Sequence, residues 1–237
     1  MTIRVASYNM RKAIGLDRLR KPDRVLSVLN ELDADIIALQ EADRRLGERA
    51  SAIPRDMIEA ESPYRAVPIE NRPNSIGWHG NAILVRKDHE IIHGEPLFLP
   101  MLEPRGAVLA DLRVRGEPVR VVGMHLDLSG LYRARQAKML VDHLGERTTQ
   151  LPSILMGDLN DWMVNSRALK EFQRHHQCAA CGPSFPTRRP LGTLDRIFVS
   201  DHFKVEESGV HSSQTAKRAS DHLPVWAKVA RSLEHGA

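Results

Sequence analysis

The chain has 237 residues, of which 42% are hydrophobic and 27% are charged, as is ordinary for a soluble globular protein, and its net charge is +4. No apolar run approaches the roughly 20 residues of a membrane span. Residues 1–5 enter strand-like sequence without the apolar region of a signal peptide, and two cysteines cannot form a disulfide framework. We therefore expect a cytoplasmic protein without stable membrane insertion, with one domain over residues 1–237.

The net positive charge is concentrated near the N-terminus. Six basic residues and two acidic residues lie between positions 11 and 24, and their difference equals the whole net charge. Such a stretch is either a solvated loop and helix start or a positive rim that attracts an anionic substrate. The basic residues are Arg11, Lys12, Arg18, Arg20, Lys21 and Arg24.

The first third of the chain predicts two strands that end in polar residues. A mostly apolar, β-branched stretch predicts a strand over residues 3–8, followed by Asn9. Pro22 suits the first turn of a helix, and the apolar residues after it have helical spacing. The continuous apolar run over 35–41 predicts a strand buried on both faces, and this strand finishes at Glu41.

The remainder predicts many strands and few helices. Helices are expected to end near residue 61, to cover 131–144, and to run from a cap at Ser166 through 172. Loops are expected over 71–80 and 182–192, and a frayed tail from about 231. Strands are expected over 64–69, 81–86, 91–98, 107–114, 118–126, 153–156, 194–199, 203–207 and 223–229. Many strands and few helices in two similar halves indicate two packed sheets flanked by helices.

The stretch 154–162 carries the clearest chemical signal. A short apolar strand ends at Gly157, and the polar residues Asp158 and Asn160 then alternate, so both side chains point to the same side of the sheet rim. A carboxylate there can bind a hard cation or hold a water, and a carboxamide can donate to a phosphate oxygen. The same two residues would also suit an Asx turn.

Other strands carry comparable residues. Asn9, Glu41 and His125 each lie at the end of an expected strand. Asp195 lies within an apolar strand, where an acid is costly to bury without a partner. A histidine is a natural partner because the pair fixes the tautomer of the ring, so we expect Asp195 to contact His222.

Seven short motifs follow one another along the chain. They are S-Y-N at 7–9, L-Q-E at 39–41, G-N-A-I-L at 80–84, M-H-L at 124–126, G-D-L-N at 157–160, L-D-R-I-F at 194–198 and S-D-H at 220–222. In this order they resemble the endonuclease/exonuclease/phosphatase superfamily, which has the DNase I-like fold. The resemblance implies an α/β protein, a four-layer α/β sandwich of two packed, mostly antiparallel β-sheets flanked by helices, with the site at one rim between the sheets.

The resemblance also implies roles for individual residues. Glu41 looks like the principal ligand of Mg²⁺ or Mn²⁺, with Asn9 assisting at the metal or phosphate and Asp221 reaching a second metal position, so one or two ions are expected. Asp158 resembles the residue that positions the attacking water, and Asn160 the one that holds a phosphate oxygen.

The resemblance also bears on the two histidines. His222, oriented by Asp195, is either the general base or a donor to phosphate. His125 is expected to protonate the leaving oxygen. DNase I-like enzymes pair this histidine with a glutamate one strand earlier, whereas segment 77–81 has no carboxylate.

Other residues bear on the substrate or on a second metal. Arg105 resembles a phosphate-contacting arginine of some family members, and Arg11 is placed with it as a phosphate-binding residue. Trp162 either stacks on a base or sugar or packs beneath its loop. Cys178 and Cys181 form a C-x-x-C pair just after two histidines, which is either a structural zinc site or a pair of reduced thiols.

These features predict a divalent-metal-dependent phosphoester hydrolase, foremost a phosphodiesterase or nuclease in which an activated water attacks phosphorus in line. Nucleic acid is the expected substrate and partner. The alternatives are a phospholipid substrate, as for sphingomyelinases, or a small phosphoester. A catalytically silent nucleic-acid-binding module is a third interpretation, disfavoured by the complete set of acids and histidines.

Overall fold

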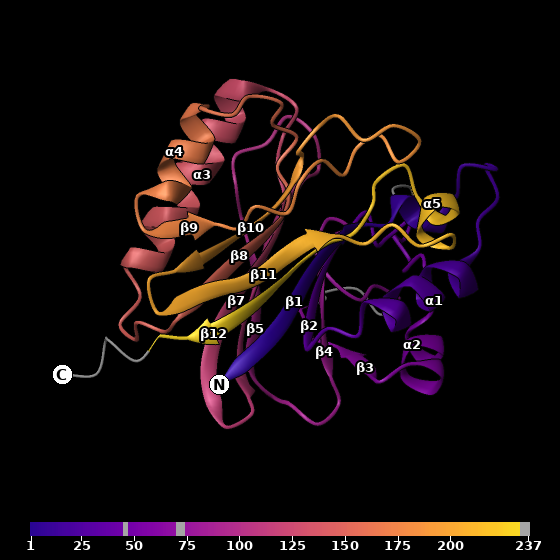
Figure 1. The fold of residues 1–237 in the computed structure, drawn as a ribbon, viewed down its shortest axis with the longest axis horizontal. Helices are drawn as coiled ribbons and strands as arrows, with labels where there is room; N and C mark the ends of the chain where they lie inside the picture. Colours follow the sequence, from indigo (N-terminus) through magenta and orange to yellow (C-terminus); the bar gives the residue numbers. More distant parts are fainter. Residues whose placement is uncertain (45–46, 70–73, 233–237) are drawn as a thin grey trace.

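Two six-stranded β-sheets pack face to face, and helices cover both outer faces (Figure 1). The computed structural model describes residues 1–44, 47–69 and 74–232. The first sheet has the order β11 (Phe203–Val210), β12 (Val225–Arg231), β1 (Thr2–Asn9), β2 (Ile36–Gln40), β4 (Ala82–Arg86) and β3 (Tyr64–Ala66). The second has the order β5 (Glu90–Leu97), β6 (Gly106–Val114), β7 (Glu117–His125), β8 (Ser153–Asp158), β10 (Asp195–Ser200) and β9 (His176–Cys178).

The helices divide between the two outer faces. A single 3₁₀ turn, η1 (Arg11–Ala13), follows β1. The first sheet is covered by α1 (Pro22–Leu32), α2 (Arg55–Glu61) and α5 (Ala216–Ala219), and the second by α3 (Gly130–Gly145) and α4 (Arg167–Gln173). The predicted cap of α4 is confirmed, because the Ser166 hydroxyl accepts a hydrogen bond of 3.1 Å from the amide of Leu169.

Three layers of apolar side chains hold this sandwich together. The middle layer lies between the sheets and contains Ile36 of β2 and Ile154 of β8, both fully buried. On one side, the apolar face of α1, with Leu29, packs on the first sheet. On the other side, Phe172 of α4 packs on the second. The expected four-layer α/β sandwich is therefore confirmed.

Strand pairing brings the polar strand ends to one edge. The strands β1 and β2 are parallel and pair Asn9 with Gln40, the residue before Glu41. The strands β7 and β8 are also parallel and pair His125 with Asp158, while the antiparallel strand β10 begins with Asp195 opposite Asp158. Because parallel strands end at the same edge, residues far apart in the sequence meet there.

Several expected element boundaries are wrong. The strand expected over 64–69 ends at Ala66, since Val67 still donates to a neighbouring carbonyl but Pro68 has no amide hydrogen to donate. The strand β9 and the helix α5, three and four residues long, were not expected because they are too short for a periodic signal. Arg231, expected to be frayed, ends β12.

The expected loop at 71–73 and the rest of the expected tail, 233–237, lie outside the described residues. No helix of the described ranges is long and apolar enough to cross a membrane.

Candidate active site

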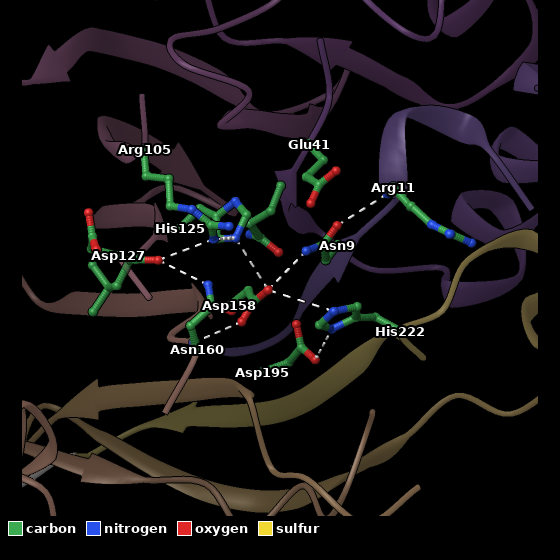
Figure 2. Close-up of polar contacts among 12 residues, drawn as sticks. Asn9, Arg11, Glu41, Arg105, His125, Asp127, Asp158, Asn160, Asp195 and His222 are labelled. Atoms are coloured by element: carbon green, nitrogen blue, oxygen red, sulfur yellow. Dashed lines mark hydrogen bonds and ion pairs between the residues drawn. The ribbon is translucent and has the colours of Figure 1, made fainter. Parts of the chain in front are cut away.

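Asp158, at the end of β8, is the centre of the polar cluster at this edge (Figure 2). Its side chain is almost fully buried, at 1% exposure. The Oδ2 atom accepts a hydrogen bond of 2.9 Å from Nδ2 of Asn9, and lies 3.4 Å from Nε2 of His125 and 3.8 Å from Nε2 of His222. Three nitrogen-bearing side chains, each from a different segment, therefore converge on one carboxylate oxygen.

Asn160 combines the two interpretations that the sequence left open. Its backbone amide donates to Oδ1 of Asp158 over 2.9 Å, and this hydrogen bond closes the Asx turn. Its φ of 51° is a left-handed conformation that asparagine tolerates. Its Nδ2 donates to the carbonyl of Leu126 over 2.9 Å. One amide hydrogen thus anchors the side chain to the end of β7 and leaves the other for a different acceptor.

Asp195 and His222 form the pair that the sequence predicted. The Oδ2 atom of Asp195 lies 2.8 Å from Nδ1 of His222 and also accepts from the hydroxyl of Ser184. Both members are buried. Burial by itself would lower the pKa of His222, but the carboxylates of Asp195 and Asp158 outweigh it and raise the pKa to about 10. The ring is therefore an imidazolium at neutral pH.

His125 has the opposite character. It is buried at the end of β7, and a guanidinium nitrogen of Arg105 contacts its Nε2. Burial, reinforced by the charge of Arg105 and opposed by that of Asp158, lowers the pKa of His125 to about 3. His125 is therefore neutral at physiological pH, and its partner is an arginine where DNase I-like relatives were expected to have a glutamate.

Asp127 was missed by the sequence analysis. It is 1% exposed and accepts hydrogen bonds from the amides of Leu102 at 2.9 Å, Glu103 at 3.4 Å and Ser129 at 2.9 Å. It thereby fixes the loop that carries Arg105. The available signal was its position two residues after a strand-end histidine, which is the same alternation that marked Asp158 and Asn160.

The expected metal ligands lie beside this cluster. Figure 2 shows Glu41 and Asn9 on the same side of Asp158. The Glu41 carboxylate is partly exposed and already takes one cation, because the ammonium of Lys12 contacts its Oε2. Asn9 directs its carboxamide oxygen to the amide of Arg11 at 3.1 Å. This oxygen-rich donor set fits a hard divalent cation, with Glu41 and Asn9 as the residues that would hold it.

Three further candidate residues contact other side chains of the protein. The Asp221 carboxylate lies 3.3 Å from Nε of Arg11, so these two residues neutralise each other at the border of the site. Arg11 is about one-third exposed. Trp162 is 60% exposed yet packs edge-on against Phe185, whose ring lies 4.6 Å from that of His222.

A second group of possible metal ligands overlaps the polar cluster around Asp158. Asp158, Asp195 and His222 each offer a ligand atom within 4.8 Å of the others. His222, however, would have to lose its proton to bind a metal, and both carboxylates hold that proton in place. No comparable group includes Cys178 or Cys181 within the described ranges, so the structure gives no support to a structural zinc site there.

A cavity lies between the loops of the two sheets at this edge. Its lining includes two carboxylates and several basic side chains, those of Glu41, Asp43, Lys12, Arg49, His79, Arg105 and His125. A phosphate group in this cavity would meet the cationic side chains of Lys12, Arg49 and Arg105.

A profile of the Endonuclease/Exonuclease/phosphatase family matches residues 6–222. The chain belongs to this family. Family members are phosphoester hydrolases that typically depend on a divalent metal. The uncharacterized protein YbhP of Escherichia coli K12 is 29% identical over 163 residues, which cover 65% of this chain and 63% of YbhP, less than two thirds of its length.

Solved family structures share the fold. An endonuclease/exonuclease/phosphatase family protein of Bacteroides thetaiotaomicron has a TM-score of 0.79 and 22% identity, with 100% of this chain and 98% of that chain covered. The mannosyl-6-phosphatase Bt3783 of the same organism has a TM-score of 0.75 and 22% identity, with coverage of 96% and 99%. At this identity the likeness shows the fold, and fold alone does not assign a substrate.

Proposed function

We propose that this chain is a divalent-metal-dependent phosphodiesterase that hydrolyses its substrate by in-line attack of a water molecule. The observation that carries this proposal is the convergence of Asn9, His125 and His222 on Oδ2 of Asp158, at 2.9, 3.4 and 3.8 Å. A buried carboxylate that accepts from the Asn9 amide and lies beside the His222 ring is suited to orient a water and accept its proton.

His222 and Arg105 would stabilise the negative charge that develops on the phosphate. The raised pKa of His222 supports the role of hydrogen-bond donor to a phosphate oxygen over that of general base, because the general base must be unprotonated. Arg105 lies at the cavity wall, and its planar guanidinium matches the geometry of phosphate oxygens. A cation held by Glu41 and Asn9 would supply further charge neutralisation and Lewis acidity.

The expected acid role of His125 receives less support. A ring with a pKa of about 3 is neutral at pH 7, and a neutral imidazole is a poor proton donor to a leaving oxygen. We propose that His125 instead holds Arg105 in position, by accepting a hydrogen bond from its guanidinium at Nε2.

The basic stretch supports a polyanionic substrate or surface, with nucleic acid as the candidate from sequence. Half of that stretch is engaged within the molecule, since Arg11, Lys12 and Arg24 pair with Asp221, Glu41 and Asp17. The other half, Arg18, Arg20 and Lys21, is exposed. Three exposed cations next to the site would attract a nucleic-acid strand or any other polyanion.

The test is hydrolysis of bis-p-nitrophenyl phosphate with Mg²⁺, with Mn²⁺ and with EDTA. We expect chelation to abolish turnover and either metal to restore it. Glu41→Gln should raise the metal concentration needed for half-maximal rate, because it removes a ligand charge at nearly constant shape. Glu59→Gln, an exposed change on α2, is the matched control and should behave as the parent. Full activity in EDTA would contradict the proposal. A folded protein without turnover under any metal would favour the silent binding module.

A further inference from the structure

Exposed apolar side chains gather around the candidate active site. Of the twelve large apolar side chains exposed in the described residues, eight lie in the connections that follow β5, β7 and β8 or precede β10. The exposures are high: 64% for Leu102, 57% for Leu128, 65% for Met163 and 68% for Leu191. Scattered single apolar residues are normal on a protein surface, but a cluster of this size marks an interaction surface.

The sheet register explains why these connections share one face. Gly106, which opens β6 after the first connection, pairs with His125, and His125 pairs with Asp158. Asp195, which follows the last connection, also pairs with Asp158. All four connections therefore leave the second sheet at the edge that carries the site, away from the two chain termini (Figure 1).

Side-chain and backbone contacts join the four connections into one surface. This surface, formed by the connections that follow β5, β7 and β8 and the connection that precedes β10, is here called the apolar rim. The amide of Leu102 donates to Asp127, the residue next to Leu128. Arg133 donates to the carbonyl of Leu128 and lies 3.6 Å from the carboxylate of Asp161.

The last contact closes the rim. A Cβ placed on Gly192, next to Leu191, would lie 2.9 Å from the ring of Trp162, so the connection before β10 packs directly on the connection after β8. The exposed residues thus form one surface around the site and do not belong to separate patches.

The exposed charges on the rim are positive. In the connections 98–105, 126–129, 159–166 and 179–194, the exposed charged side chains are Arg188 and Arg189. The acids Asp127 and Asp161 are buried, and the partly exposed Glu103 pairs with Arg105 at 3.2 Å. On the facing sheet, the exposed basic residues of the stretch 11–24 border the same site.

We propose that the apolar rim docks on the surface of an anionic phospholipid bilayer. Six of its eight exposed apolar side chains are aliphatic, and aliphatic side chains enter the boundary between headgroups and acyl chains but cannot stack on nucleic-acid bases. Trp162 is suited to the headgroup level, and Arg188 and Arg189 to the negative surface potential. A protein partner would also bury apolar surface. It would not, however, explain why Arg188 and Arg189 are the exposed charges of the rim, whereas an anionic bilayer attracts exposed cations.

Docking in this way turns the cavity of the site toward the headgroups, where phosphodiesters are concentrated. The choice of a lipid phosphate as substrate rests on the proposed hydrolase function, whereas docking itself does not. Binding is therefore measured without turnover, so that a failure of docking leaves the hydrolase proposal standing and a failure of metal-dependent hydrolysis leaves docking standing.

The test is sedimentation with vesicles of phosphatidylcholine mixed with phosphatidylglycerol, compared with phosphatidylcholine alone. We expect the parent protein to bind the mixed vesicles, and the triple variant Leu102→Ser, Met163→Ser, Leu191→Ser to bind at least about tenfold more weakly. The matched control is Ile92→Ser with Met139→Ser, two apolar residues that are 47% and 46% exposed outside the rim, and it should bind as the parent does.

A second variant tests the charges. Arg188→Gln with Arg189→Gln should weaken binding to the mixed vesicles by roughly tenfold and leave binding to neutral vesicles unchanged. In the parent, emission of Trp162 should shift to shorter wavelength on vesicle addition, and Trp162→Phe should remove that shift. All variants should hydrolyse bis-p-nitrophenyl phosphate at the parent rate.

Two results would overturn the proposal. One is a triple variant that sediments with mixed vesicles as strongly as the parent does. The other is a parent protein that does not bind either kind of vesicle. If the triple variant then binds single-stranded DNA more weakly than the parent does, the rim is assigned to nucleic acid.

Discussion

Replacing Asp195 with asparagine isolates what the buried carboxylate does for His222. The change keeps the shape of a side chain that is 1% exposed and removes its charge. The pKa of His222 is about 10 against an ordinary 6.5, which amounts to about 5 kcal/mol in favour of the imidazolium. The charges of Asp195 and Asp158 together produce this preference and outweigh burial, which opposes it. Asp195→Asn should therefore lower the pKa of His222 by several pH units.

The kinetic consequence follows from the loss of a charged donor. We expect kcat to fall by a factor on the order of 10²–10⁴, or about 3–5 kcal/mol in the barrier. His222→Ala should cost a similar factor, and the double variant should be little worse than the worse single variant, because the pair acts as a unit. Ser184→Ala removes the other partner of the same oxygen without touching the ring, and should cost much less.

Stability supplies an independent readout of the same charge. A histidine whose pKa is raised on folding contributes stability that is fully present below about pH 6.5 and is lost as the pH rises through about 10. Urea unfolding of the parent should therefore show this loss across the alkaline range, and Asp195→Asn should flatten it. NMR titration of the His222 ring reports the pKa directly. Additive kinetic losses, or an unchanged pKa, would refute the coupling of these residues.

Two further changes probe the surroundings of the site. Neutralising Arg18, Arg20 and Lys21 together should raise KM for DNA or RNA and flatten its salt dependence while leaving hydrolysis of bis-p-nitrophenyl phosphate nearly unchanged; unaffected nucleic-acid cleavage would mean that these cations are only a solvated surface. Asp127→Ala should release the amides of its loop and lower kcat through misplacement of Arg105, with a protease-sensitivity assay of that loop as the structural check; an unchanged loop and rate would show that the arginine is positioned without it.

The layers of the fold could be predicted because each strand carries its own periodic signal. The run that became β2 reads as buried on both faces, and the structure buries all five of its residues. The strands that were missed or misjudged are those whose pairing is decided by tertiary contacts. For example, β9 consists of three residues that pair only with the end of β10, and nothing local in its sequence distinguishes it from a loop.

The site could be predicted at the level of residue types and strand ends, but its pairings could not. The contact of Asp195 with His222 was anticipated because a buried acid needs a partner. The contact of His125 with Arg105 was not, since the arginine comes from a loop whose path depends on hydrogen bonds to Asp127. Sequence periodicity describes strands and helices, whereas the route of a loop is decided by amides that leave no pattern in the sequence.

The charge balance of the site explains where the basic stretch is used. Two almost fully buried carboxylates, Asp158 and Asp195, share the single imidazolium of His222, so that group keeps one net negative charge. Such a group would repel a phosphate if it stood alone. The neighbouring cations Lys12 and Arg105 offset it at the cavity wall.

Some of the basic residues between positions 11 and 24 therefore offset the negative charge of the site, which would otherwise repel an anionic substrate. Arg11 neutralises the carboxylate of Asp221, and Lys12 neutralises that of Glu41. The cations that remain exposed, together with Arg188 and Arg189, act at longer range on whatever polyanion approaches. Changing the exposed set should therefore alter attraction to a surface or strand, whereas changing Lys12 should alter the chemistry itself, and this separation can be measured with one small substrate and one polyanionic one.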